Sequence, residues 1–148
     1  MNVINQVIDN LDCTKITNKH IFISNSIINT LNLDFTSYDC HISIKNCQII
    51  NLKIHSVWFK QGLLFENNII KNKIQYEMGG HNEHSIKLIN NIFCELVVFF
   101  DCHFIDKLIL QNNIFCRGAT VMADLSMNTF QSGIELKNNI GDLNINQI

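Results

Sequence analysis

Histidine and acidic side chains that could do chemistry gather in the second half of the sequence. Three histidines, His81, His84 and His103, recur there together with the carboxylates of Glu83 and Asp106. Imidazole and carboxylate groups are common zinc ligands, and two neighbouring imidazoles can also exchange protons as an acid–base pair. The sequence therefore allows a site for zinc or a similar divalent metal at His81, His84 and His103. The alternative is that these histidines simply occupy a polar surface.

A second candidate is the tripeptide Asp-Cys-His, which occurs in YDCHI (38–42) and in FDCHF (100–104). A cysteine beside a histidine suggests nucleophilic catalysis. Adjacent side chains in a β-strand point to opposite faces, however, so the thiol and the imidazole would not meet. We expect no catalytic residue here. The six cysteines are expected to be reduced thiols that act as small apolar residues, and the absence of a CxxC pair argues against a structural zinc knuckle.

The composition is that of one globular domain spanning residues 1–148. Hydrophobic residues make up 47% of the chain and charged residues 16%, and the net charge is -2. So small a charge gives no field to hold nucleic acid or an anionic membrane. No apolar stretch approaches the roughly 20 residues of a membrane span, and the segment MNVINQVIDN lacks the features of an export signal. We therefore expect a cytoplasmic protein without a nucleic-acid or membrane partner.

A repeat defines the elements that must position these residues. Asparagine recurs at steps of 21, 21, 23, 22 and 26 residues, by subtraction, and two apolar residues precede each asparagine at alternate positions. Such alternation is typical of a strand with one buried face. The asparagines are Asn25, Asn46, Asn67, Asn90, Asn112 and Asn138.

Two further columns share this spacing of about 22 residues. One is apolar and the other is aromatic, except that Asn82 stands where an aromatic ring is expected. Three columns with a single period indicate a solenoid. The columns are Leu31, Leu52, Ile74, Leu96, Val121 and Leu143, and Tyr38, Phe59, Asn82, Phe104 and Phe130.

Each repeat contains three short strand patterns and no helical pattern. This predicts an all-β fold, a right-handed parallel β-helix of about six coils. Coils of such a fold stack about 4.8 Å apart, so like residues lie above like residues. An asparagine at the bend between two sides can adopt the left-handed conformation and bond the same residue in the next coil. We therefore expect Asn90 to be an internal rung of an asparagine ladder, with the aromatic column stacked in the core.

The turn sequences NCQI, NNII, NNIF, NNIF and NNIG resemble the asparagine-ladder turns of right-handed β-helix proteins, the broad pectate-lyase-like and pentapeptide-like group. The resemblance covers about residues 20 to 145 and implies the fold alone. Polysaccharide lyases of this group are much longer, and they carry acidic calcium clusters and basic catalytic residues that this sequence lacks. The resemblance therefore implies no activity.

The N-terminal segment is expected to cover the first coil. Val3, Ile4, Val7, Ile8 and Leu11 recur at helical spacing, which predicts a short capping helix within residues 1–17, followed by coils over residues 18–148. The alternative is a frayed extra coil.

Several apolar side chains are expected to face solvent. Alternation places Val97 and Phe99 on the outside, beside Met122 on the next coil, and a column before the aromatic ladder places Trp58 outside next to His81. Exposed apolar residues on adjacent rungs form a patch of the kind that binds a partner. The alternative is that a terminal segment folds over them.

These observations predict a non-enzymatic protein-binding or scaffolding β-helix. It could act as an immunity-type or inhibitory partner protein, or polymerise end to end, and it needs no cofactor. Because the last coil ends with unpaired strand groups, we also expect a homodimer joined through the C-terminal coil. The alternative function is a small enzyme or zinc-binding protein that uses His81, His84 and His103.

Overall fold

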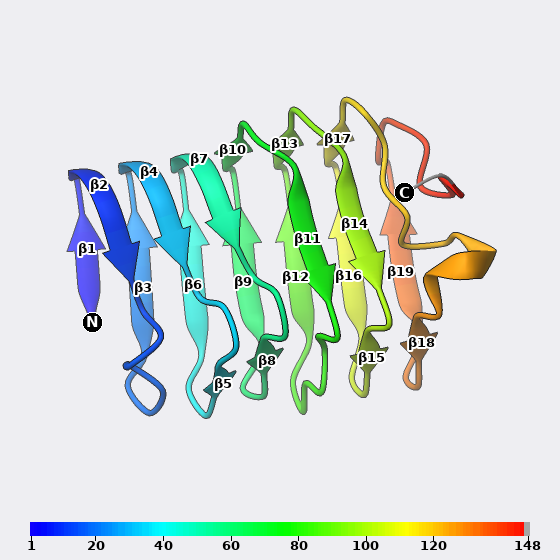
Figure 1. Ribbon diagram of the computed structural model, residues 1–148, viewed down its shortest axis with the longest axis horizontal. Helices are drawn as coiled ribbons and strands as arrows, with labels where there is room; N and C mark the ends of the chain where they lie inside the picture. The colour runs from blue at the N-terminus through cyan, green and yellow to red at the C-terminus, as the bar shows by residue number, and fades with distance from the viewer. Residues whose placement is uncertain (147–148) are drawn as a thin grey trace.

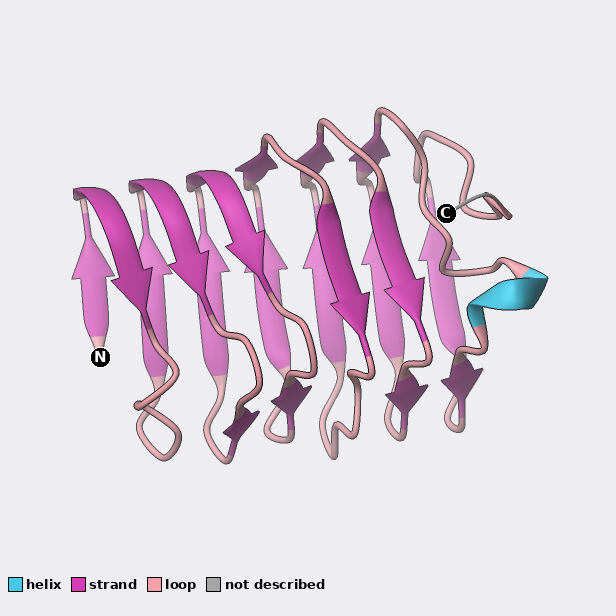
Figure 2. Cartoon of the chain, viewed as in Figure 1, coloured by secondary structure: helices cyan, strands magenta, loops and turns pink. Residues whose placement is uncertain are grey.

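The computed structural model describes residues 1–146 and shows parallel strands stacked in successive coils (Figure 1). The fold is an all-β parallel solenoid of about five full turns with a period of about 21 residues, slightly fewer turns than the six predicted. Within the described residues the one helical segment is a short 3-10 turn, η1 (Asp124–Ser126), which projects near the C-terminal end (Figure 2). No helix in that part of the chain is long and apolar enough to cross a membrane.

One side of the solenoid is a seven-stranded parallel sheet, here the first sheet. Its neighbours pair in register, so that Ile21 lies opposite Ile42 and Ile42 lies opposite Leu63. Each of these steps is 21 residues, by subtraction, which is the repeat found in the sequence. The strands in spatial order are β1 (Asn2–Ile4), β3 (Ile21–Ser24), β6 (Ile42–Lys45), β9 (Leu63–Glu66), β12 (Ile86–Ile89), β16 (Leu108–Gln111) and β19 (Ile134–Lys137).

A second sheet follows the first around one corner of each coil. Its six strands in spatial order are β17 (Ile114–Phe115), β13 (Ile92–Phe93), β10 (Ile69–Ile70), β7 (Gln48–Lys53), β4 (Ile27–Asn32) and β2 (Val7–Asp12). Shorter strand pairs complete the remaining sides: β11 (Ile74–Glu77) with β14 (Val97–Phe100), β5 (Ser37–Tyr38) with β8 (Trp58–Phe59), and β15 (His103–Phe104) with β18 (Thr129–Phe130).

Aromatic rings stack inside the coils as predicted, with one substitution. Tyr38 stacks on Phe59 with ring centroids 6.0 Å apart. Where the sequence column contained Asn82, the ring is supplied by Tyr76, which lies 6.1 Å from Phe59 and 6.2 Å from Phe104. Asn82 is also buried, but its amide donates to turn carbonyl oxygens instead of filling the aromatic column.

The asparagines form two ladders, and the prediction chose the wrong one as buried. Asn90 and its equivalents have a left-handed backbone, with φ of 56° at Asn90, and this conformation turns their side chains outward into solvent. Their amides still bond along the axis, for example from Asn46 Nδ2 to Asn25 Oδ1 at 3.1 Å. The buried ladder lies one residue later in the chain. Its members within the described residues are Asn68, Asn91 and Asn113, continued by the half-buried Asn139.

The predicted N-terminal helix is wrong, and the alternative of an extra coil is right. Residues 2–12 form β1 and β2, which pair in parallel with β3 and β4. Asn5, with φ of 56°, turns the chain between the two strands and changes the face on which apolar residues fall. As a result Val3 and Ile8 are half-buried while Val7 is exposed, although their spacing also fits a helix.

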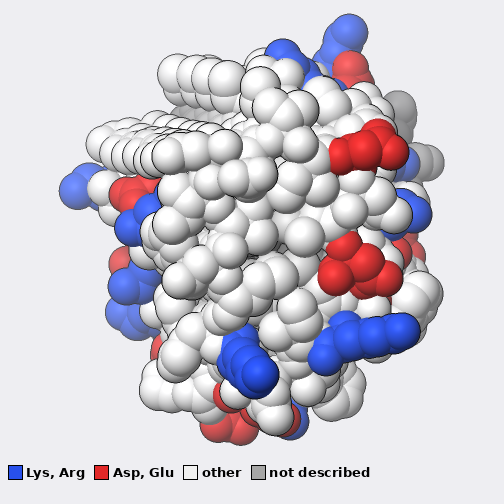
Figure 3. All heavy atoms as spheres, turned by 90° about the vertical axis from the view of Figure 1, so that its left-hand side faces the viewer, with Lys and Arg blue, Asp and Glu red and all other residues white. Residues whose placement is uncertain are grey.

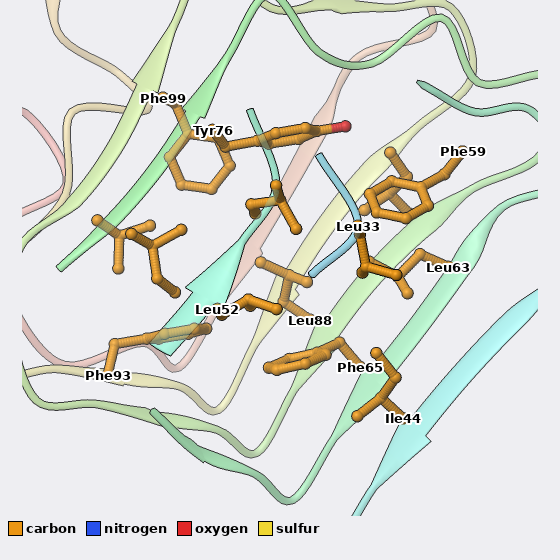
Figure 4. Close-up of a pocket in the computed structure, with 14 residues that line it drawn as sticks. Leu33, Ile44, Leu52, Phe59, Leu63, Phe65, Tyr76, Leu88, Phe93 and Phe99 are labelled. Atoms are coloured by element: carbon orange, nitrogen blue, oxygen red, sulfur yellow. The ribbon is translucent and has the colours of Figure 1, made fainter. Parts of the chain in front are cut away.

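An apolar cavity of about 40 Å³ lies in the core of the middle coils (Figure 4). Side chains from several coils line it, including Leu33, Leu52, Phe93 and Val97, and none of the exposed lining is polar. A void lined only by hydrocarbon offers water no hydrogen-bond partner, so we expect it to be dry.

Candidate functional site

Trp58, His81 and His103 lie side by side on the surface and form an aromatic ridge. The Trp58 and His81 ring centroids are 4.2 Å apart, and the His81 and His103 centroids are 5.5 Å apart. The sequence correctly brought these three residues together. Trp58 is 39% exposed and its indole N–H donates to the carbonyl oxygen of Met78 at 3.3 Å.

Gly80 explains how the ridge is built. In the ladder of backbone bridges, Gly80 lies between Trp58 and His103, so this rung has no side chain of its own. A Cβ at Gly80 would lie 2.2 Å from the His103 carbonyl oxygen, and its φ of +88° also favours glycine. His81, with φ of 50°, fills the space that Gly80 leaves between the two rings.

The local environment favours the neutral form of His81. Burial lowers the pKa of His81, and the neighbouring His103 lowers it further. The Nδ1 atom of His103 is hydrogen-bonded to the Thr129 hydroxyl group. The ridge therefore presents two imidazoles whose simultaneous protonation is unfavourable.

The structure does not bring all three predicted metal ligands together. His84 lines a separate surface groove with His20 and His41. Across residues 1–146, no group of three or more histidine, cysteine, aspartate or glutamate side chains could hold a metal ion. Zinc binding at His81, His84 and His103 stays a prediction that only metal titration tests.

The predicted patch around Val97 is wrong because the alignment slipped by one residue. Val97 pairs with Ile74 and Phe99 pairs with Tyr76, which places both on the inward face, where each is only 2% exposed. Aligning Leu96 with Ile74 instead moved every side chain of this strand to the opposite face. Met122 is exposed as expected, at 41%, but on the segment that leads into η1.

The Asp-Cys-His tripeptides are not nucleophilic sites. Cys40 and Cys102 are buried, whereas His103 is exposed and His41 is half-buried on the outside of the coil. Burial raises the pKa of the Cys102 thiol to about 12, which keeps it protonated at neutral pH. All six cysteines are free thiols.

A surface that the sequence interpretation missed runs along the corner between the first and second sheets. We call it the aliphatic stripe, and it holds one outward side chain per coil from the start of each strand of the second sheet. Val7 is 82% exposed, Ile27 is 49% and Ile140 is 64%. The stripe comprises Val7, Ile27, Gln48, Ile69, Ile92, Ile114 and Ile140.

The exposed asparagine ladder borders this stripe, two residues earlier in each coil. Its members are Asn5, Asn25, Asn46, Asn67, Asn90, Asn112 and Asn138, all with positive φ. Figure 3 looks along the solenoid from its N-terminal end and shows uncharged side chains in regular rows that recede from the viewer. The signal was present in the turn sequences themselves, because in NNII and NNIF the third letter is the outward residue.

The sequence matches no protein-family model, and neither curated proteins nor solved structures give a match. The class of the protein therefore rests on its own geometry, which is that of a parallel β-solenoid with an internal asparagine ladder. Its lateral surface carries a narrow uncharged stripe and, on another side, the aromatic ridge.

Proposed function

We propose that the protein is a non-enzymatic binding or scaffolding solenoid that holds another protein on its aliphatic stripe. The carrying observation is that six of the seven stripe positions are aliphatic, with Gln48 the exception, and that Val7, Ile27, Ile114 and Ile140 are exposed. Exposed apolar residues in contiguous rows mark interaction surfaces. An inhibitory or immunity-type partner protein is the form of this function that we favour.

The lack of charge along the stripe supports this proposal. The stripe and the asparagine ladder together make fourteen positions, seven in each column, and none carries a charge. A typical surface with 25–35% charged residues would place about four charges there. Interface cores are depleted in charged residues in the same way. Backbone stacking also makes the surface straight, which suits an extended or helical partner segment.

We further propose a cytoplasmic location and a homodimer joined at the C-terminal coil. Free thiols at all six cysteines suit a reducing compartment. In the described residues β19 pairs only with β16, and its Leu136, in line with the buried Leu110, is 43% exposed. Light scattering tests the dimer, since a mass near 17.1 kDa at tens of micromolar would contradict it. Leu136→Lys should shift a dimer to monomer.

Site-specific photo-crosslinking tests the docking surface. A photoreactive residue in place of Ile69 on the stripe should capture a partner from a lysate of the source organism. The matched control places the same residue at Lys87, which is exposed on the outer face of the first sheet. Ile92→Lys, on the neighbouring rung, should abolish capture from position 69 without changing the melting curve. Equal capture from both positions, or capture that Ile92→Lys does not affect, would contradict the proposal.

A further inference from the structure

Gly62 leaves a gap in a column of side chains at the corner that precedes the first sheet. His20, His41, Gly62 and Ser85 come directly before the in-register residues that begin β3, β6, β9 and β12, so they occupy successive coils. Gly62 has φ of +80°, and a Cβ there would lie 2.7 Å from the Ser85 carbonyl oxygen. The coil therefore has a hollow where its neighbours have side chains.

The side chains around this hollow share one chemical property. The groove has a volume of about 440 Å³, and its polar lining groups are an ammonium, three imidazoles, an amide and a hydroxyl. All of these can donate hydrogen bonds, and none of them is a carboxylate. The lining residues are His20, His41, Gln61, Leu63, Leu64, His84, Ser85 and Lys87.

Carboxylates near the groove are engaged elsewhere. Asp39 pairs with Lys60 at 2.9 Å, and Glu135 pairs with Lys107. Glu83 lies close enough to Lys60 to raise the pKa of that ammonium group, after the larger effect of Asp39.

The other charged groups leave the groove positive. Asp106 acts in the same way on Lys107, after Glu135. The amino group of Met1 donates to the His20 carbonyl oxygen at 2.5 Å, which adds a positive charge at one end. Lys87 has no ion pair among the described residues, so its charge is available to the groove.

The bond made by His41 fixes how its ring presents itself. His41 Nδ1 lies 3.1 Å from the carbonyl oxygen of Gln61, so this nitrogen must carry a proton and donate. Protonation at Nε2 then turns the free side of the ring into a second charged donor. Histidine is the side chain whose charge changes between about pH 5 and pH 8.

These observations favour an anion over a metal ion. No three potential metal ligands converge in residues 1–146, so the three imidazoles surround a space too wide for one metal centre. We propose that the groove at Gly62 binds a small tetrahedral oxyanion, held by Lys87 and by His20, His41 and His84 when protonated. The binding strengthens as the pH falls. This site is independent of the proposed protein-binding stripe and lies on a different corner of the coil.

Sulfate is the right probe because its own charge does not change between about pH 6 and pH 8. The imidazole C–H resonances of all six histidines are followed by NMR during sulfate titration at a constant ionic strength of about 0.15 M. We expect saturable shifts at His20, His41 and His84, and none beyond the ionic-strength baseline at His55, His81 and His103. One or two added unit charges at about 4 Å contribute a factor of about five each in water, so binding should be about 5- to 30-fold tighter at pH 6.

Two exposed-residue variants complete the test. Lys87→Gln should weaken sulfate binding about fivefold by the same Coulomb argument, and His84→Gln should reduce its pH dependence. His103→Gln is the matched control and should leave the affinity unchanged. Shifts that grow linearly without saturation, equal shifts at all six histidines, or an affinity that Lys87→Gln leaves unaltered would each overturn the proposal.

Discussion

Replacing Asn91 by leucine should destabilise the solenoid more than any change in the exposed ladder. The Asn91 amide nitrogen donates to the Phe65 carbonyl oxygen at 2.8 Å and to Asn113 Oδ1 at 3.0 Å. Its Oδ1 accepts from the Asn68 backbone N–H at 2.9 Å and from Asn68 Nδ2 at 3.2 Å. All of these groups lie in the interior.

The magnitude follows from counting which partners have no other bond. Asn113 Oδ1 keeps the Asn91 backbone N–H, and Asn68 Nδ2 keeps the Ile44 carbonyl oxygen. The Phe65 carbonyl and the Asn68 N–H lose their side-chain partner in the variant. Each buried group left unpaired costs about 1–3 kcal/mol, so Asn91→Leu should lower the free energy of unfolding by about 2–6 kcal/mol.

Asn90→Gly is the matched control from the adjacent position. Asn90 is exposed, and its left-handed backbone conformation is one that glycine adopts freely, so the change should cost well under about 1 kcal/mol. Urea denaturation of both variants measures the difference as a shift in midpoint at unchanged slope. A loss for Asn90→Gly that equals or exceeds the loss for Asn91→Leu would refute the assignment of the buried ladder.

Three further predictions concern the aromatic ridge and the core. Trp58 is the only tryptophan and stacks on His81, so its fluorescence should fall as His81 gains a proton, with a midpoint below 6.5, and His81→Asn should remove the titration. The pKa of His81 is lowered on folding, so its contribution to stability is present above the unfolded-state pKa and is lost as the pH falls through the folded-state pKa; urea midpoints should decline accordingly. The zinc hypothesis expects a higher melting temperature with zinc that His81→Ala combined with His103→Ala abolishes, and unchanged curves would remove it. Val97→Ile adds a methylene at the apolar cavity and should stabilise by up to about 0.8 kcal/mol, whereas Val57→Ile, at a fully buried site outside the cavity lining, should destabilise by about 1–3 kcal/mol.

The period and the parallel stacking were predictable because they depend on residue types that recur at fixed intervals. Stacked coils bring like side chains together, so the repeat appears in the amino-acid sequence itself as an asparagine every 21 to 26 residues. The choice between Asn90 and Asn91 was not predictable from spacing alone. It depends on which of two consecutive asparagines takes the left-handed conformation, and the one that does turns its amide outward.

Other errors also arose where the chain departs from simple alternation. Val97 and Phe99 were assigned to the wrong face because the turn before β14 differs in length from its counterparts, and a slip of one residue reverses a strand. The aliphatic stripe was missed because alternation was followed within strands but not across the corner at Asn90. His84 was grouped with His81 by proximity in sequence, although the bend between them carries the two side chains to different surfaces.

The buried ladder also has a direction. The backbone N–H of Asn68 donates to Asn91, that of Asn91 donates to Asn113, and that of Asn113 donates to Asn139. The exposed ladder runs the other way, since each amide donates to the preceding coil. The two rows of amide dipoles therefore oppose each other along the axis and partly cancel.

The same polarity makes the coils interchangeable units. A duplicated coil inserted between Asn68 and Asn91 would find an acceptor ahead of it and a donor behind it, so the buried ladder would close again without a new kind of contact. Deleting the coil that carries Asn139 would instead leave the Asn113 N–H without its acceptor. The length of this molecule is thus open to change in its middle by whole coils, while its last internal amide depends on the coil that follows.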